Sequence, residues 1–205
     1  MQQATANVIG TPGGSVSRMS GAYEGRAAIG KAGEQRTARA LAGLCQGSGP
    51  TVLHDLRLPM GKVSANIDHI VVAGQQVTIL DSKAWRPGHI WTFRGQTRRG
   101  LHRFSAGDRR TLELAQVAIA ALLNRSGIEC QIAKPIMVVW PSNDSKPLRL
   151  WRFRPAGARA VSGRRFARRT KQLVGSAPAD RRIVSALFPL VIGSGAQEPD
   201  EDPFA

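Results

Sequence analysis

Two aspartates and a lysine occur at a spacing that suits phosphoryl chemistry. Asp68, Asp81 and Lys83 lie within or just after two β-rich runs, at residues 67–72 and 77–80. Two carboxylates on one face repel each other unless a cation neutralises them, and an oxygen-bound divalent cation does so. A lysine ammonium beside such a pair can hold an attacking water or offset charge that develops on a phosphate. These residues therefore predict a divalent-cation site, Mg²⁺ or Mn²⁺, suited to chemistry on a phosphate.

The segment between the two runs predicts how the three side chains come together. Gly74-Gln75 suits a two-residue hairpin loop, since a type II′ turn favours glycine at its first central position. Extending that pairing places Asp68 directly opposite Asp81, with Cβ atoms about 5 Å apart. Lys83 points to the same face because side chains alternate along a strand. His69 points to the other face, where packing is favoured over catalysis.

A third acid lies upstream, on a helix predicted over residues 31–45. One stripe of this helix at helical spacing consists of Glu34, Ala38, Leu41 and Cys45. The stripe carries Glu34 toward the core, where it can bind a second metal ion or a metal-bound water. The alternative is an acid of the first helical turn that interacts favourably with the helix dipole.

These segments resemble the nuclease-related domain (NERD) family of the PD-(D/E)xK, restriction-endonuclease-like superfamily. The resemblance is carried by Gly33-Glu34, by residues 66–72 (NIDHIVV) and by residues 79–85 (ILDSKAW), and it extends over roughly residues 31–140. It implies an α/β fold in which helices flank a mixed central β-sheet. It also implies a metal-dependent nuclease or DNA-processing protein that hydrolyses phosphodiester bonds.

The resemblance further implies roles for single residues. Glu34 is similar to the helical acid of the family and Asp68 to its strand aspartate, which makes them the expected metal ligands together with Asp81. Asp81 and Lys83 match the (D/E)xK element, and Gln116 matches a polar position in the helix after the sheet. These five residues form the expected catalytic set. The sequence has aspartate rather than the commoner glutamate in the last motif, which shortens the reach of that carboxylate by one methylene.

Each of these assignments has a structural alternative. The two aspartates could be ordinary strand-end residues in salt bridges with Lys83, and Gln116 could be a satisfied structural amide. Trp85 and Trp91 could stack nucleic-acid bases, but hairpin aromatics usually pack in the core.

The composition is strongly basic. The 205 residues include 29 Lys and Arg against 14 Asp and Glu, which gives a formal net charge of +15. Such a field favours a polyanionic partner, with nucleic acid first, DNA before RNA, and an anionic membrane second. Phosphate contacts give affinity and salt dependence without reading sequence. The expected contacts come from a basic loop after residue 93 and from one side of a helix over residues 163–174, and they are Arg94, Arg98, Arg99, Arg103, Arg165, Arg168 and Arg169.

The chain should form one α/β domain between two tails. Residues 1–28 are predicted to be a flexible leader, 29–192 the nuclease-related domain with a basic helical C-terminal part, and 193–205 a disordered acidic tail. Further strands are expected at residues 51–58, 90–93, 135–140 and 148–153, and further helices from a capping box at 105–108 to residue 124 and over 180–187.

Several classes of protein are excluded or disfavoured. Cys45 and Cys130 form no CxxC pair, which excludes a disulfide scaffold and a cysteine-rich zinc module. No apolar run approaches the roughly 18 residues of a transmembrane helix, and residues 1–20 lack a signal-peptide core, so a cytoplasmic protein is expected. Two rivals to the nuclease remain: a catalytically silent nucleic-acid-binding module of the same fold, and a membrane-surface protein using the basic helix. The second is weaker, because no apolar face suited to insertion is expected in residues 163–174.

Overall fold

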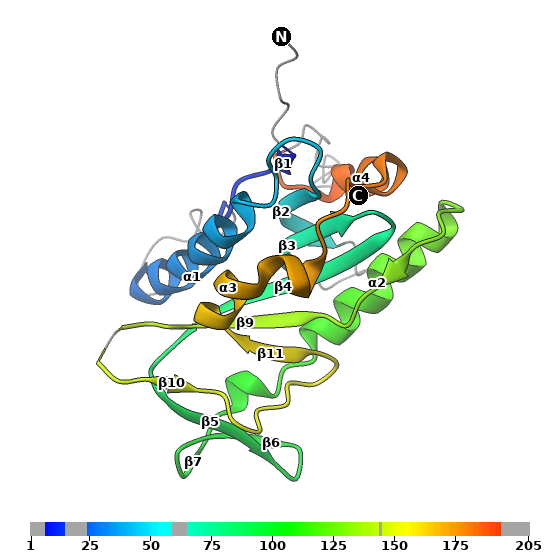
Figure 1. The fold of residues 1–205 in the computed structure, drawn as a ribbon. Helices are drawn as coiled ribbons and strands as arrows, with labels where there is room; N and C mark the ends of the chain where they lie inside the picture. Colours follow the sequence, from blue (N-terminus) through cyan, green and yellow to red (C-terminus); the bar gives the residue numbers. More distant parts are fainter. Residues whose placement is uncertain (1–6, 15–23, 59–64, 144, 194–205) are drawn as a thin grey trace, which may run out of the picture.

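The computed structural model describes residues 7–14, 24–58, 65–143 and 145–193. Figure 1 shows a main β-sheet with helices packed against it and a smaller sheet at the lower end of the view. The elements in chain order are β1 (Val8–Ile9), α1 (Glu24–Ala42), β2 (Thr51–Leu58), β3 (Ala65–Ala73), β4 (Gln76–Trp85), β5 (Gly88–Phe93), β6 (Gln96–Arg99), β7 (His102–Arg103), η2 (Ser105–Gly107), α2 (Thr111–Arg125), β8 (Gln131–Ile132), β9 (Ile136–Pro141), β10 (Leu148–Arg149), β11 (Arg159–Ser162), α3 (Gly163–Val174), α4 (Arg181–Leu187) and η3 (Phe188–Leu190).

The β3–β4 hairpin has the predicted register. Gly74 has a φ of 59° whereas Gln75 has no positive φ, as a type II′ turn requires. Antiparallel pairing starts at this turn and continues to His69 opposite Leu80. The glycine therefore sets the alignment that brings Asp68 and Asp81 level with each other.

The strand β4 lies in the interior of the main sheet. The strand order is β1-β2-β3-β4-β9-β11, and β8 also pairs with β4. Neighbours from β2 to β4 are antiparallel, whereas β1–β2, β4–β9 and β9–β11 are parallel. The strand predicted over residues 135–140 is β9, and its residues 136–139 are all buried, as is typical of a continuous apolar run in an interior strand. The predicted mixed central sheet is thus confirmed.

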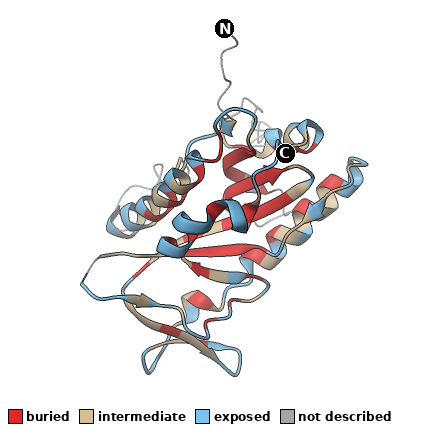
Figure 2. Cartoon of the chain, in the orientation of Figure 1, coloured by how far each residue is buried: buried red, intermediate tan, exposed pale blue. Residues whose placement is uncertain are grey.

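Helices cover both faces of the main sheet. One core cluster joins Val72 and Ile79 to residues of α2 and α4, and the other joins Val71 and Leu80 to residues of α1 and α3. Because neighbouring residues of a strand point to opposite faces, α1 and α3 lie on one side of the sheet and α2 and α4 on the other. Figure 2 shows the buried residues concentrated on β2, β3, β4 and β9 between these layers.

The predicted basic loop after residue 93 is instead part of a second sheet. The strands β5, β6 and β7 form an antiparallel meander, and β10 pairs in parallel with β5. Arg94 and Gly95 both have positive φ values (45° and 75°), as a type I′ hairpin turn requires. The strand predicted over residues 148–153 is confined to β10, because Arg152 adopts a φ of 59° that breaks an extended course.

The N-terminal boundary of the fold also differs from the prediction. The strand β1 pairs with the start of β2, and α1 begins at Glu24 and ends at Ala42 rather than spanning residues 31–45. Residues 7–14 and 24–28 are therefore parts of the fold and not of a leader. The rest of the predicted leader, and residues 194–205 of the predicted acidic tail, lie outside the described residues.

The helix α2 begins at Thr111, later than predicted. The capping box does not form, because Asp108 accepts a hydrogen bond from the backbone N–H of Thr97 at 2.7 Å and so ties the small sheet to the start of the helix. Residues 105–107 form a single 3₁₀ turn instead. The predicted end of the helix is confirmed, since α2 stops at Arg125 and Gly127 follows with a φ of 66°.

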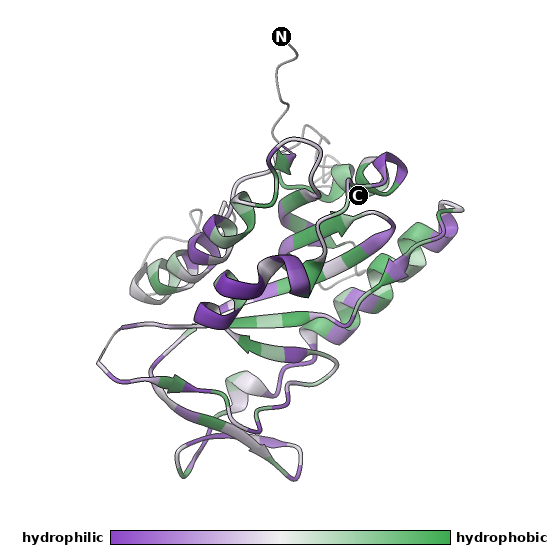
Figure 3. Ribbon diagram, viewed as in Figure 1, coloured by the Kyte–Doolittle hydropathy of each residue, from purple (hydrophilic) through white to green (hydrophobic). Residues whose placement is uncertain are grey.

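The helix α3 has the predicted bounds but is more amphipathic than expected. Phe166, Thr170 and Val174 are buried against the core that it shares with α1, while the remaining residues are largely polar (Figure 3). Its apolar side is therefore already covered by the protein. None of the helices in the described ranges is long and apolar enough to cross a bilayer.

Candidate active site

Pairing between β2 and β3 is interrupted where two aspartates face each other. Residues on both sides of Asp55 and Asp68 are paired in one register, but these two are not. Asp55 has a φ of 53°, in the left-handed region that non-glycine residues rarely adopt. The alternation of side chains between the two faces of the sheet also breaks here. Leu53 and Leu56 are three residues apart yet pack in the same core cluster, and so do Ile67 and Ile70 on either side of Asp68. The sheet is therefore locally irregular at this position.

The carboxylate of Asp68 is held by the next strand. Its Oδ2 accepts a hydrogen bond from the backbone N–H of Ser82 at 2.6 Å. Followed away from the turn, the regular β3–β4 pairing ends at His69, which comes directly after Asp68 in the chain. Asp68 thus satisfies a backbone donor of β4 with its side chain and lies beside Asp81, to which the hairpin register aligns it.

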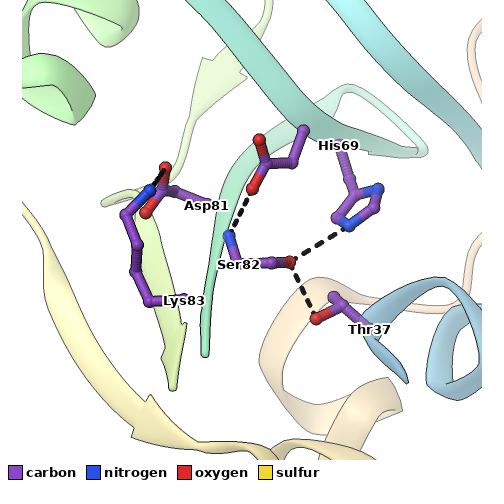
Figure 4. Close-up of polar contacts among 6 residues, drawn as sticks. Thr37, His69, Asp81, Ser82 and Lys83 are labelled. Atoms are coloured by element: carbon purple, nitrogen blue, oxygen red, sulfur yellow. Dashed lines mark hydrogen bonds and ion pairs between the residues drawn. The ribbon is translucent and has the colours of Figure 1, made fainter. Parts of the chain in front are cut away.

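Asp81 and Lys83 point to the same side of β4, as predicted. The Nζ of Lys83 donates to Oδ1 of Asp81 at 2.6 Å, and Figure 4 shows the two side chains turned toward each other. Oδ2 of Asp81 is buried without a hydrogen-bond partner among the described residues. Burial by itself lowers the pKa of Lys83, but the charges of Asp81 and Asp68 and the bond to Asp81 outweigh it and raise the pKa.

Glu34 approaches this cluster from α1. Its residue is only 8% exposed, so the predicted inward stripe is confirmed. Burial, followed by repulsion from Asp55, raises the pKa of Glu34 from 4.5 to about 7; the charge of Lys83 and a backbone hydrogen bond from Gly13 oppose the rise. Burial and then repulsion from Asp81 likewise raise the pKa of Asp68 well above its usual value.

The donor set fits a divalent cation. The buried, unpartnered Oδ2 of Asp81 is a free ligand atom. Burial first, and repulsion from neighbouring carboxylates second, raise the pKa values of Asp68 and Glu34, and a cation would offset both effects. Carboxylate oxygens are also the ligands that Mg²⁺ prefers. No three His, Cys, Asp or Glu side chains of the described ranges lie close enough to form a ready-made cage. The protein would therefore offer such an ion the two aspartates, Asp68 and Asp81, and not a complete set of ligands.

A chain of polar side chains supports β4 from the α1 side. Nδ1 of His54 lies 2.7 Å from Nδ1 of His69, and Nε2 of His69 lies 3.2 Å from the Ser82 hydroxyl. Ser82 donates to Thr37 at 2.8 Å, and the Trp140 indole donates to the same Thr37 oxygen at 2.9 Å. Figure 4 shows Ser82 between His69 and Thr37. The prediction that His69 faces away from Asp68 and packs is confirmed.

The side chain of Gln116 forms no hydrogen bond with the described residues of this cluster. The buried stripe of α2 consists of Leu112, Ala115, Ile119 and Leu123. Gln116 lies half-buried next to that stripe. Its catalytic role stays a prediction to which the geometry adds nothing.

The arginines predicted to bind nucleic acid form two separate groups. One group lies in the small sheet or its first turn and consists of Arg94, Arg98, Arg99 and Arg103. The other is exposed on α3 and consists of Arg165, Arg168 and Arg169. The small sheet follows β4 after only two residues, whereas α3 lies on the face of the main sheet opposite α2. The first group therefore follows directly, along the chain, from the strand that carries Asp81 and Lys83.

Sequence reasoning missed Asp55. It belongs to β2, where it is 5% exposed, and it contributes the largest electrostatic part of the raised pKa of Glu34. The available signal was an acid in the middle of an otherwise buried strand, which rarely occurs without a partner or a function.

The fold and the Asp81–Lys83 pair together define a restriction-endonuclease-like α/β protein. The nuclease-related domain family matches residues 29–136, just over half of the 205-residue chain, and the chain belongs to this family. The match extends from α1 to the first residue of β9 and includes Glu34, Asp68, Asp81 and Lys83. No curated protein and no solved structure gives a significant match to the chain.

Proposed function

We propose that this protein is a metal-dependent nuclease that hydrolyses phosphodiester bonds of nucleic acid in the cytoplasm, with DNA preferred over RNA. The observation that carries this proposal is the Asp81–Lys83 pair beside Asp68, where β3 and β4 stop pairing and Oδ2 of Asp81 is buried without a partner. Family membership and the net charge of +15 support nucleic acid as the substrate.

Asp68 and Asp81 would hold Mg²⁺ or Mn²⁺, and Glu34 would bind a second ion or an ion-bound water. The ion would supply Lewis-acid polarisation of the phosphate and a more acidic water. The backbone N–H of Ser82 fixes the orientation of the Asp68 carboxylate. The hydrogen-bonded chain through Ser82 and Thr37 keeps β4 in place against α1.

Lys83 acts as a cation and not as a base. Its raised pKa and the 2.6 Å contact with Asp81 keep the ammonium protonated at neutral pH, so it cannot accept the proton of the attacking water. Its N–H groups instead donate to that water or to a phosphate oxygen. The positive charge stabilises the negative charge that develops as the new P–O bond forms and the ester P–O bond breaks.

The two arginine groups supply affinity through phosphate contacts. Arg94, Arg98, Arg99 and Arg103 lie in the small sheet that follows β4, and Arg165, Arg168 and Arg169 offer a second positive surface on α3. Neither group reads sequence, since contacts of this kind go to the backbone.

The experiment is a cleavage assay with circular and linear DNA and with RNA, in Mg²⁺, Mn²⁺ or EDTA. Asp81→Asn and Lys83→Gln should each lower metal-dependent cleavage by about 100-fold or more, as expected for loss of a transition-state contact. Glu129→Gln and Lys171→Gln make the same charge changes at exposed positions and should retain activity. Cleavage that persists in Asp81→Asn, or the absence of cleavage with every metal, contradicts the proposal.

A catalytically silent nucleic-acid-binding module of the same fold is the second candidate. The Asp81–Lys83 ion pair favours it in one respect, because the pair neutralises both side chains without a ligand. Salt-sensitive DNA binding without cleavage under any metal supports this module over the nuclease.

A further inference from the structure

One face of the small sheet carries a row of aromatic rings. In β5, Ile90 is fully buried while His89, Trp91 and Phe93 point to the other side. The ring centroids of His89 and Trp91 are 6.5 Å apart, and those of Trp91 and Phe93 are 6.1 Å apart. Trp151 extends the row, with its ring 5.8 Å from that of His89. We call these four side chains the aromatic platform.

The aromatic platform is exposed and held in place. Trp151 is 64% exposed and Phe93 is 53% exposed. The indole N–H of Trp91 donates to the carbonyl of Gly100 at 2.9 Å, which fixes the ring. Figure 2 shows intermediate and exposed residues over most of this sheet, in contrast to the main sheet.

Trp85, three residues before β5, shows the contrast. It is 8% exposed and packs edge-on against Phe104 and Phe153, with centroids 4.8 Å and 5.6 Å away. The core of this region is therefore built by Trp85 and not by the platform. The sequence left open whether Trp85 and Trp91 pack in the core or stack on bases. Trp85 packs in the core, whereas Trp91 lies outside it.

Arginines flank the aromatic platform on both sides. Arg149 of β10 pairs with His89, and Arg98 of β6 pairs with Trp91, so each shares a face with its aromatic partner. Arg98 in turn pairs with Arg103 of β7. The guanidinium of Arg94 lies 5.4 Å from the Phe93 centroid. The apolar row is thus bordered by positive charge, with no acidic side chain in β5, β6, β7 or β10.

We propose that the aromatic platform binds a single-stranded segment of nucleic acid by stacking unpaired bases on its rings, while the flanking arginines contact the phosphates. Exposed rings bordered by cations are the arrangement that single strands use, because every base has a π-face and the backbone is negative. A duplex hides these faces within its stack and offers only phosphates and groove edges. The inference rests on the proposed function to the extent that the substrate is nucleic acid, and it names the single-stranded form.

The test measures binding without cleavage. Fluorescence anisotropy of a labelled oligothymidylate and of a fully paired, blunt-ended DNA duplex is recorded in EDTA with the full chain. Trp91→Leu combined with Phe93→Leu should raise the Kd for the single strand by about 5-fold or more and leave the Kd for the duplex unchanged. Trp91→Phe keeps a ring and should bind the single strand within about 3-fold of the unaltered protein. Phe188→Leu removes an exposed ring outside the platform, 42% exposed in η3, and should change neither Kd.

The outcomes separate this inference from the nuclease proposal. Equal losses on the two ligands, no loss in the double variant, or a Trp91→Phe variant as weak as the double variant would overturn the platform. None of these results bears on cleavage by Asp81 and Lys83. Conversely, if the rings are needed for single-strand binding but no metal supports cleavage, the proposal for the aromatic platform holds and the nuclease proposal is contradicted.

Discussion

Asp55 and Asp68 occupy opposite positions in the register of β2 and β3, at the one point where the described ladder omits a pair. Asp55 adopts a φ of 53° there, and Asp68 turns its carboxylate to the backbone of β4. Because pairing is interrupted here, the carboxylate of Asp55 lies near Glu34 of α1, while that of Asp68 lies near Asp81.

The backbone of Asp55 should favour glycine over alanine. Asp55→Gly and Asp55→Ala both delete the carboxylate and differ only in a Cβ held at positive φ, which costs about 1 kcal/mol in the left-handed region. We expect the glycine variant to be the more stable by about that amount in urea unfolding. Ala120 is the control, because it is a half-buried residue within α2 where glycine has no conformational advantage. There Ala120→Gly should lower the free energy of unfolding.

The carboxyl of Glu34 should make the protein less stable as the pH rises. Its pKa is about 7 in the folded protein and 4.5 as usual, so between these values the unfolded chain releases a proton that the folded protein keeps. The free energy of unfolding therefore falls across this window by about 3 kcal/mol. Glu34→Gln should remove that fall, with a gain at pH 8 and none at pH 4. The measurement is urea unfolding in EDTA, and an equal effect at both pH values contradicts the expectation.

His54 should make the protein less stable as the pH falls, opposite in direction to the effect of Glu34. Burial lowers its pKa from 6.5 to about 4 against the weaker pull of Asp55, and burial with the charge of His54 lowers the pKa of His69 further. The unfolded chain therefore binds protons below pH 6.5 that the folded protein does not, and stability falls as the pH drops toward 4. NMR shifts of both rings should stay those of neutral imidazole at pH 5.5. A protonated His54 at that pH contradicts the buried chain described above.

The contact between α3 and β9 should tolerate no added methyl group. A Cβ at Gly163 would lie 2.1 Å from the Trp140 ring, whereas a Cβ at Gly30 in α1 meets nothing within 4 Å. Gly163→Ala should cost about 1–3 kcal/mol through overpacking, and Gly30→Ala should stabilise by about 0.5–1 kcal/mol through helix propensity. Thermal or urea unfolding of the two variants, measured side by side, gives opposite signs.

The arginines beside the platform should contribute to the salt dependence of binding. Arg98→Gln with Arg103→Gln removes two phosphate contacts, which should lower the slope of log affinity against log salt by about 1.4 for a single strand. Arg125→Gln with Lys134→Gln makes the same charge change at exposed positions outside both arginine groups and should leave the slope unchanged. Equal slopes in the two double variants contradict phosphate contact at the platform.

Much of the fold followed from local signals. Gly74 at the first turn position fixed the hairpin register, and the apolar run of residues 136–139 identified an interior strand. The basic meander escaped prediction because two- to four-residue strands rich in arginine carry little β-propensity, although the Arg94–Gly95 turn was a usable signal.

The site was predicted only where spacing along one hairpin determines it. Asp81 and Lys83 share a strand face by alternation, so their contact followed from the sequence. The role of Asp55 did not follow from the sequence. Asp55 in β2 raises the pKa of Glu34 in α1, and this depends on a tertiary contact and on a positive φ at Asp55 that no periodicity in the sequence encodes. The role of Gln116 stays a prediction, since α2 lies far along the chain from the hairpin and spacing within one helix does not fix its place relative to Asp81.

Only Arg86 and Pro87 separate β4 from β5. Pro87 restricts this joint, and the Trp85 ring anchors it from one side in the core. The length of chain between Lys83 and the aromatic platform is therefore short and constant. A single strand stacked on these rings would therefore keep the same offset from the Asp81–Lys83 pair whatever its sequence.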